Sequence, residues 1–296
     1  MSAATPVGTI RAPRGTGAST PLFDEPGPRT LRLIRLATAV SVVALTALAV
    51  WVVHVFGENG QLAADRWHEF TAWPTWRYLI AGFLGTLRGA VGAAAIALPL
   101  GVVLALGRLS ERRPVRWLCV AVIEFFRAMP LLLLVYIFFF ALPRHGINPA
   151  LFWQLVIPIG LCSGATLAEV FRAGILALPA GQTEAAYAVG MTHGQAMRLV
   201  VLPQATRLVL PGLLAQVVVL LKDTTLGYVV SYSELQFSAK VLVSSTGHLV
   251  QTYLLVTILY VLINLAISKA ADAWGRRERR AYARAGAAST TATGIA

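Results

Sequence analysis

The chain has 296 residues, of which 57% are hydrophobic and only 13% are charged, and several apolar runs are close to the length of a bilayer-spanning helix. This composition excludes a single water-soluble globular core and favours an integral membrane protein. The net charge of +12 does not indicate a nucleic-acid-binding protein, because most arginines flank apolar runs, as on the cytoplasmic face of membrane proteins. Cys119 and Cys162 lie inside apolar runs without the spacing of a disulfide or metal site.

The N-terminal part of the chain combines a polar arm with an apolar run. Residues 1–30 are rich in Pro, Gly, Ser and Thr, so we expect a disordered cytoplasmic arm. The run Leu33–Phe56 extends about 36 Å as a helix at 1.5 Å per residue, which is enough to cross a bilayer. It is too long for a signal-peptide core and lacks a convincing cleavage site, so it is predicted to remain as an anchor. Residues 31–78 are therefore expected to form an extra N-terminal transmembrane helix and an external loop.

Five further apolar runs predict an all-α protein with about six transmembrane helices. The runs are Leu79–Leu106, Trp117–Leu142, Leu151–Phe171, Leu208–Tyr232 and Leu249–Ser268. Six crossings leave both termini on one side, and the arginine clusters at 108–116 and 276–284 place that side in the cytoplasm. The sequence therefore predicts a multi-pass cell-membrane protein with both termini cytoplasmic. Residues 273–296 are expected to form a basic, disordered tail.

The loop between the fourth and fifth spans, residues 179–203, is then cytoplasmic. Gln182–Arg198 contains good helix formers and small or apolar residues at helical intervals, with Pro179 before it and Pro203 after it. These features predict one short helix. Its small residues would let another surface approach closely, and Glu184 offers a charge for an ion pair. On periodicity alone, an amphipathic helix lying on the membrane fits equally well.

This loop also carries a specific motif: Glu-Ala-Ala, three residues, Gly, nine residues, an aliphatic residue, any residue, then Leu-Pro. It resembles the coupling loop of ABC importer permeases. Further stretches resemble the polar amino-acid uptake permeases of the histidine, glutamine and glutamate group, and the similarity covers about 83–268. These stretches are EFFRAMPLLLL, SGATLAEVFRAGILALPAGQTEAA and LPQATRLVLPGLLAQVVVLLKDTTL. The coupling positions that the motif assigns are Glu184, Ala185, Ala186, Gly190 and Pro203.

The resemblance implies a five-span type I importer core in residues 79–272, preceded by the additional first helix. Such permeases work as homo- or heterodimers with a second permease subunit, seat each coupling helix in a cytosolic ATPase dimer, and receive the amino acid from an extracytoplasmic binding protein. The sequence has no GxxxxGK[ST] phosphate loop. ATP and Mg²⁺ are therefore expected to bind to the partner ATPase. This chain is expected not to be an enzyme and to bind no cofactor.

Two pairs of opposite charges lie inside the predicted spans. Glu124 and Arg127 are three residues apart, as are Glu169 and Arg172, so each pair can lie on one helix face. The third span runs outward and the fourth inward, which places both pairs in the cytoplasmic third, where they could form one network. We interpret this network as a packing clamp rather than as part of the substrate path, because charges inside membranes usually pair with one another.

A second polar group lies near mid-membrane in the fifth span. Lys222 and Asp223 are followed by Thr224, Thr225 and Gly227, a composition that permits an irregular turn. Interrupted helices at this depth often supply transport sites. The Lys222 ammonium could attract a substrate carboxylate and Asp223 an α-amino group. The alternative is that these residues only stabilise the break in the helix.

Other functions find less support in the sequence. The five histidines have no metal-ligand spacing, and no Ser, His and acid set indicates a catalytic site. A secondary amino-acid transporter and a non-transporting membrane scaffold remain alternatives, which ATP-driven uptake would separate from an ABC importer. Residues 222–235 look most like glutamate or glutamine permeases, so a polar amino acid, with glutamate first, is the expected substrate.

Overall fold

The computed structural model describes residues 27–293, which contain helices and no strand. The arm at 1–26 and residues 294–296 lie outside the described part. The α-helices are α1 (Pro28–Glu58), α2 (Ala64–His68), α3 (Trp73–Arg108), α4 (Arg113–Ala128), α5 (Leu131–Tyr136), α6 (Leu142–Arg144), α7 (Leu151–Leu176), α8 (Ala180–Ala188), α9 (His193–Ala196), α10 (Leu202–Asp223), α11 (Leu235–Thr246) and α12 (Leu249–Thr293). The short 3₁₀ helices are η1 (Glu69–Thr71) and η4 (Thr224–Tyr228), and the π-helices are η2 (Ile137–Ala141) and η3 (Met197–Val201).

The long apolar helices confirm the predicted all-α membrane fold. Five helical stretches are long and apolar enough to cross a membrane, and a bent helix pair brings the number to six if it counts as one span. The five stretches are Pro28–Glu58, Trp73–Arg108, Leu151–Leu176, His193–Tyr228 and Leu249–Ala270. About six spans were expected, so the number agrees.

The third expected span, Trp117–Leu142, is not one straight helix. The structure breaks it between α4 and α5, and the two parts are bent by 95°. Pro130 causes the break, because proline lacks an N–H and disfavours the helical conformation of the residue before it. Met129 accordingly has an extended backbone with ψ of 128°.

The structure also differs from the sequence expectation at the C-terminus. Helix α12 continues to Thr293, through a segment that was expected to be disordered from residue 273 onward. The segment is rich in Ala and Arg and contains no proline, so its intrinsic helix propensity is high.

The described chain divides into two units, one ending at Leu62 and the other beginning at Ala63. The first unit contains α1, which has no buried residue. The second unit takes in α2 and η1, because Phe70 packs in one apolar cluster with Leu79 of α3 and Leu235 of α11.

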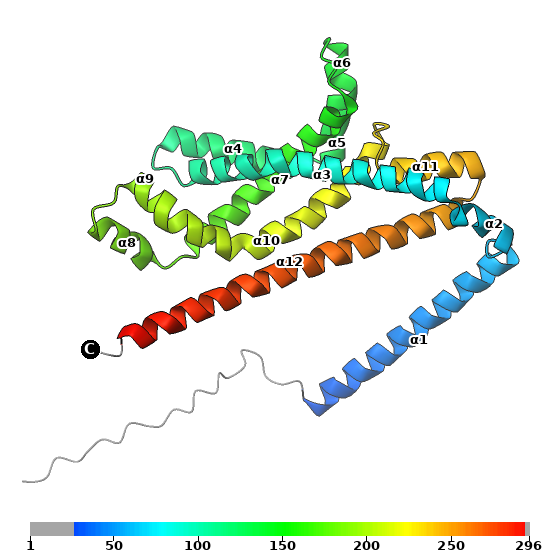
Figure 1. Ribbon diagram of the computed structural model, residues 1–296, viewed down its shortest axis with the longest axis horizontal. Coiled ribbons are helices and arrows are strands. Elements are labelled where there is room, and N and C mark those ends of the chain that lie inside the picture. The colour runs from blue at the N-terminus through cyan, green and yellow to red at the C-terminus, as the bar shows by residue number, and fades with distance from the viewer. Residues whose placement is uncertain (1–26, 294–296) are drawn as a thin grey trace, which may run out of the picture. The chain divides into compact units, whose positions relative to one another are not determined.

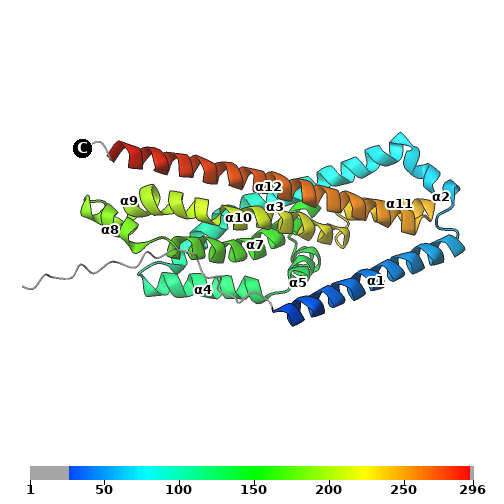
Figure 2. The same cartoon turned by 90° about the horizontal axis from the view of Figure 1, so that it is seen from below.

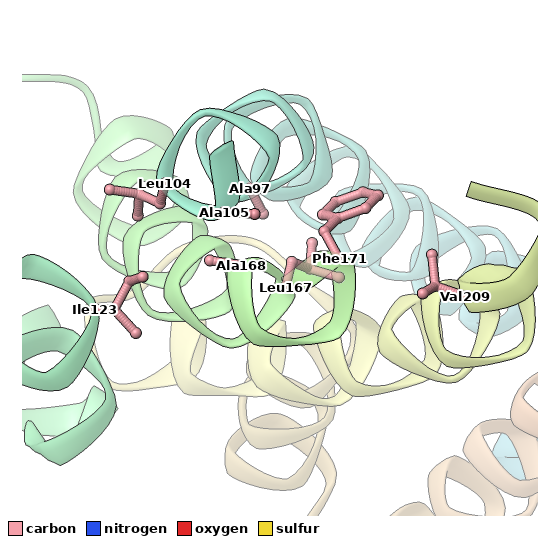
Figure 3. Packing of buried hydrophobic residues seen from close by; sticks show 8 residues of the cluster. All are labelled: Ala97, Leu104, Ala105, Ile123, Leu167, Ala168, Phe171 and Val209. Carbon is pink, nitrogen blue, oxygen red and sulfur yellow. The ribbon is translucent and has the colours of Figure 1, made fainter. Parts of the chain in front are cut away.

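The core of the second unit lies where α3 packs along α7 (Figures 1 and 2). Figure 3 shows one apolar cluster of this core, with residues from α3, α4, α7 and α10. The cluster consists of Ala97, Leu104, Ala105, Ile123, Leu167, Ala168, Phe171 and Val209. Glycines let the backbones approach closely: Gly101 faces Leu167, and Gly164 faces Leu100.

The two ends of this unit carry different elements. In both views, α8 and α9 lie at one end, whereas α11 lies at the opposite end (Figures 1 and 2). Helix α10 runs between these ends. The unit therefore has one face built from the α8–α9 segment and an opposite face built around α11.

Replacing Gly101 with valine should destabilise the fold. A β-carbon there would lie 2.8 Å from Cβ of Leu167 and 3.2 Å from the carbonyl oxygen of Gly164. Overpacking of this kind costs about 1–3 kcal/mol. Thermal unfolding in detergent would measure the loss. Gly57→Ala in α1 is the control, because nothing lies within 4 Å of a β-carbon there; equal unfolding midpoints for the two variants would contradict the close packing.

Candidate functional site

The loop between α7 and α10 forms two short helices instead of the single helix that was predicted for Gln182–Arg198. Helix α8 ends at Ala188, and α9 begins at His193. Between them Gly190 has a φ of +82°, a left-handed conformation that glycine adopts without a steric penalty. We call residues 180–201 the coupling segment.

A readable sequence signal for this second helix was overlooked. The side chain of Thr192 accepts a hydrogen bond from the backbone N–H of Gln195, and the side chain of Gln195 accepts one from the backbone N–H of Thr192. This reciprocal capping box has the spacing Thr-x-x-Gln, which marks a helix N-terminus. The sequence Thr-His-Gly-Gln therefore predicts the start of α9.

The motif residues of the coupling segment are mostly at the surface. Glu184, Ala185 and Gly190 are exposed, whereas Ala186 is only 4% exposed and forms the buried side of α8. Pro203 is exposed and does not follow the end of a helix as predicted. It lies directly after the π-helix η3, inside a helical stretch that continues from α9 into α10.

Side-chain hydrogen bonds hold the coupling segment together. The hydroxyl of Tyr187 on α8 lies 2.8 Å from Nδ1 of His193 on α9. Nε2 of Gln204 on α10 donates to Oε1 of Gln182 on α8 at 3.1 Å. The exposed surface around Glu184 is thus tied to the first turns of α10. Because the stretch from His193 to Tyr228 is one continuous apolar span, this surface is connected directly to the residues at the far end of α10.

The irregular turn expected after Lys222 and Asp223 is present. Helix α10 ends at Asp223, and the 3₁₀ helix η4 starts at Thr224. The hydroxyl of Thr224, which is 0% exposed, donates to the carbonyl oxygen of Leu221 at 2.8 Å, and that of Thr225 donates to the carbonyl oxygen of Lys222 at 2.7 Å. Lys222 is exposed and Asp223 half-buried, so neighbouring residues face different surroundings.

The two expected charge pairs form, and an arginine that was not predicted joins them. Nη1 of Arg127 lies 3.7 Å from Oε1 of Glu124, and Nε of Arg172 lies 3.2 Å from Oε2 of Glu169. Nη1 of Arg108 lies 3.5 Å from Oε1 of Glu124 and also donates to Oε1 of Glu169. One guanidinium thereby connects α3 with both α4 and α7.

Arg108 was missed because it is far in sequence from both carboxylates, and local spacing cannot reveal such a contact. The only signal is its place at the end of an apolar run, where arginine is common for topological reasons. A cavity of about 430 Å³ lies close by, between the α3–α4 turn and the coupling segment, with Glu111, Arg112 and Arg198 in its lining. In the described residues no cluster of His, Cys, Asp or Glu could hold a metal ion.

Comparison with known proteins identifies the family. Residues 97–280 match the model of the binding-protein-dependent transport system inner membrane component. The chain belongs to this family. The permease is therefore a multi-pass membrane protein, and the resemblance to ABC importer permeases that was drawn from the Glu-Ala-Ala motif is confirmed.

Individual relatives agree with this assignment. The permease is 36% identical over 230 residues to the glutamate transport system permease protein GluD of Corynebacterium glutamicum, covering 76% of this chain and 84% of that protein. It is 34% identical over 201 residues to the probable glutamine ABC transporter permease protein GlnM of Bacillus subtilis, covering 68% and 93%. A crystal structure of an amino acid ABC transporter with histidines superposes with a TM-score of 0.64 at 32% identity, covering 68% of this chain and 94% of that chain.

Replacing Arg108 with methionine should destabilise the permease by about 1–3 kcal/mol, because Glu169 loses a charged hydrogen-bond donor and Glu124 loses an ion pair at once. Arg127→Ala is the matched control: its side chain is 43% exposed and forms an ion pair with Glu124, so its loss should cost about 0–1 kcal/mol. Thermal unfolding of both variants in the same detergent checks the order. An Arg127 variant as unstable as the Arg108 variant would contradict the central position of Arg108.

Proposed function

We propose that this permease is the transmembrane subunit of an ATP-driven importer of polar amino acids, with glutamate or glutamine as the substrate. The observation that carries the proposal is the exposed surface of the coupling segment at Glu184, Ala185 and Gly190. It is connected through α10 to the 3₁₀ helix η4, which directly follows Lys222 and Asp223. The printed functions of the glutamate and glutamine relatives support the substrate class.

The coupling segment would bind a cytosolic ABC ATPase dimer. Glu184, Ala185, Gly190 and Pro203 are exposed and available to such a partner, whereas Ala186 is buried and packs toward the interior of the permease. ATP and Mg²⁺ would be bound by the ATPase, because the sequence carries no phosphate loop. In this proposal the coupling segment and both termini lie in the cytoplasm. A second permease subunit and an extracytoplasmic binding protein would complete the importer.

The proposed cycle is alternating access. Closure of the ATPases on ATP would draw the two coupling segments of the permease dimer together, and α10 would carry the displacement to η4. The passage would then open outward to receive an amino acid from the binding protein, and hydrolysis would restore the inward-facing state.

The substrate path would include Lys222, Asp223, Thr224 and Thr225. The exposed Lys222 ammonium suits a substrate carboxylate, and the half-buried Asp223 carboxyl suits an α-amino group. The two threonine hydroxyls are occupied by backbone carbonyl oxygens, so these residues would shape the turn. The network of Arg108 with its partners would act as a clamp that fixes α3, α4 and α7 against one another.

Reconstitution of the permease with its ATPase and binding protein in proteoliposomes tests the proposal. We expect vanadate-sensitive, ATP-dependent uptake of labelled glutamate or glutamine. Uptake that is driven by a proton gradient without ATPase would instead identify a secondary carrier. Absence of uptake together with absence of ATPase binding would identify a scaffold.

Replacing Gly190 with valine should weaken ATPase binding while membrane insertion stays intact. A β-branched residue at φ of +82° is strained, and this strain would distort the turn between α8 and α9. Gly190→Asn is the control, because asparagine tolerates this conformation better. Copurification with the ATPase measures binding. Equal copurification of the valine variant and the unmodified chain would contradict the coupling assignment.

Replacing Lys222 with methionine should raise the KM for amino-acid uptake about tenfold or more, because a charged hydrogen bond contributes about 1.5–3 kcal/mol. Lys269→Met is the control, since Lys269 is an exposed lysine of α12 outside the proposed path. Initial uptake rates over a range of substrate concentrations give both KM values. An unchanged KM and maximal rate for the Lys222 variant would remove this residue from the substrate path.

A further inference from the structure

A buried carboxyl at the end of the unit opposite the coupling segment has no place in the cycle described so far. Glu234 precedes α11 and is 0% exposed. Its Oε1 accepts a hydrogen bond from the backbone N–H of Phe237 at 2.6 Å, and its Oε2 accepts one from that of Gln236 at 2.8 Å. Glu234 therefore caps the N-terminus of α11, where a negative charge is favourable.

The same carboxyl is held by α12. The hydroxyl of Tyr260 donates to Oε2 of Glu234 at 3.1 Å. With three donors on two oxygens, the carboxyl connects its own turn to a membrane-spanning helix that is distant in sequence. A carboxyl that is buried to this degree is rare unless its partners are fixed.

Helix α3 holds the adjoining backbone from a third side. The backbone N–H of Leu235 donates to Oγ1 of Thr86 at 3.1 Å, and the hydroxyl of Tyr232 donates to the carbonyl oxygen of Gly85 at 3.0 Å. A side chain at Gly85 would collide with the carbonyl oxygen of Ser233. We call Glu234, Tyr260, Thr86 and Tyr232 the Glu234 cluster.

The Glu234 cluster also contacts the helix break of the proposed substrate path. A β-carbon on Gly227 of η4 would lie 3.1 Å from Cγ of Glu234, so η4 rests against this side chain. A β-carbon on Gly89 of α3 would lie 3.1 Å from Cγ2 of Thr224, so the start of η4 packs on α3 as well. The cluster and the helix break thus form one packed region.

We propose that Glu234 is a positioning residue for transport: its carboxyl fixes the turn between η4 and α11 against α3 and α12. With this turn fixed, displacement of the coupling segment changes the geometry of Lys222 to Thr225 instead of moving α10 and η4 together. The inference rests on the proposed function, because it assigns the mechanical support of the substrate path.

The protonation state of Glu234 gives this role a measurable signature. Burial raises the pKa of the Glu234 carboxyl from 4.5 to about 7, although the hydrogen bonds from Gln236, Phe237 and Tyr260 act in the opposite direction. A folded-state pKa above the unfolded value means that this group's stabilising contribution is complete below pH 4.5 and is lost as the pH rises through about 7.

The titratable groups nearest the Glu234 carboxyl do not change charge in this window. Tyr260 faces Glu234 from α12, and Tyr232 lies in the same turn, where burial raises its pKa further above the usual value near 10. Arg88 of α3 is close enough to Tyr232 to oppose that rise, and arginine stays charged throughout. A pH dependence centred near 7 that disappears with Glu234 therefore reports on Glu234 itself.

The test uses the complete importer in proteoliposomes with Glu234→Gln, which holds the position neutral at every pH. We expect the KM for uptake by the unmodified complex to change around pH 7, and this step to be absent from the pH profile of the Gln variant. Tyr260→Phe should move the inflection to higher pH, because the charged carboxylate loses a donor. Glu69→Gln, a change at an exposed carboxyl of η1, should keep the unmodified profile.

Hydrogen exchange of residues 224–246 provides a readout that does not depend on transport. Glu234→Ala removes the cap of α11 and should accelerate exchange in this segment about tenfold. The positioning role is overturned if the Gln variant keeps the unmodified pH profile or if the Ala variant keeps the unmodified exchange rates. If the unmodified complex shows no ATP-driven uptake, the importer proposal fails. The hydrogen-exchange rates of the Glu234→Ala variant still show whether Glu234 fixes the turn: accelerated exchange supports this role and unchanged exchange overturns it.

Discussion

The contact of α3 with α7 is made over a seam of small residues, and the other helices of the second unit pack around this pair. In a bilayer, association of helices gains little from the hydrophobic effect, because lipid tails are as apolar as the side chains. Close packing must supply the stabilisation instead. Gly101 and Gly164 allow it by bringing each backbone against a leucine of the other helix. The resulting pair is the surface on which α4, α10 and α11 are placed.

Charged residues complete this packing at the end of α3. Arg108 and Glu169 have side-chain exposures of only 22% and 23%. A charged group at membrane depth is stable only with a partner, so a guanidinium shared by two carboxylates restricts how the three helices can be arranged. Glu234 has a similar effect further toward the N-terminus of α3: its carboxyl accepts from Tyr260 of α12, and the backbone N–H of Leu235 beside it donates to the hydroxyl of Thr86. Helix α3 is thus anchored by polar contacts at both ends of its apolar seam.

Much of the architecture could be read from the sequence, because bilayer thickness fixes the length of an apolar helix and the motif around Glu184 is specific. Two of the local errors were avoidable: Pro130 signals the bend after α4, and Thr192 with Gln195 signals the start of α9. Arg108 and Glu234 are different. The partners of Arg108 and the Tyr260 partner of Glu234 come from other helices, and such contacts leave no trace in the spacing of a single sequence.

The bend between α4 and α5 limits what can lie next to it. The last carbonyl oxygens of α4 have no helical partner, because the chain turns by 95° at Met129 and Pro130. Acyl chains offer no hydrogen-bond donor, and an unsatisfied carbonyl in hydrocarbon costs several kcal/mol, on the order of a full hydrogen bond. Wherever these carbonyl oxygens reach hydrocarbon depth, they need shielding from lipid, by water, by polar side chains of the permease or by a neighbouring polypeptide.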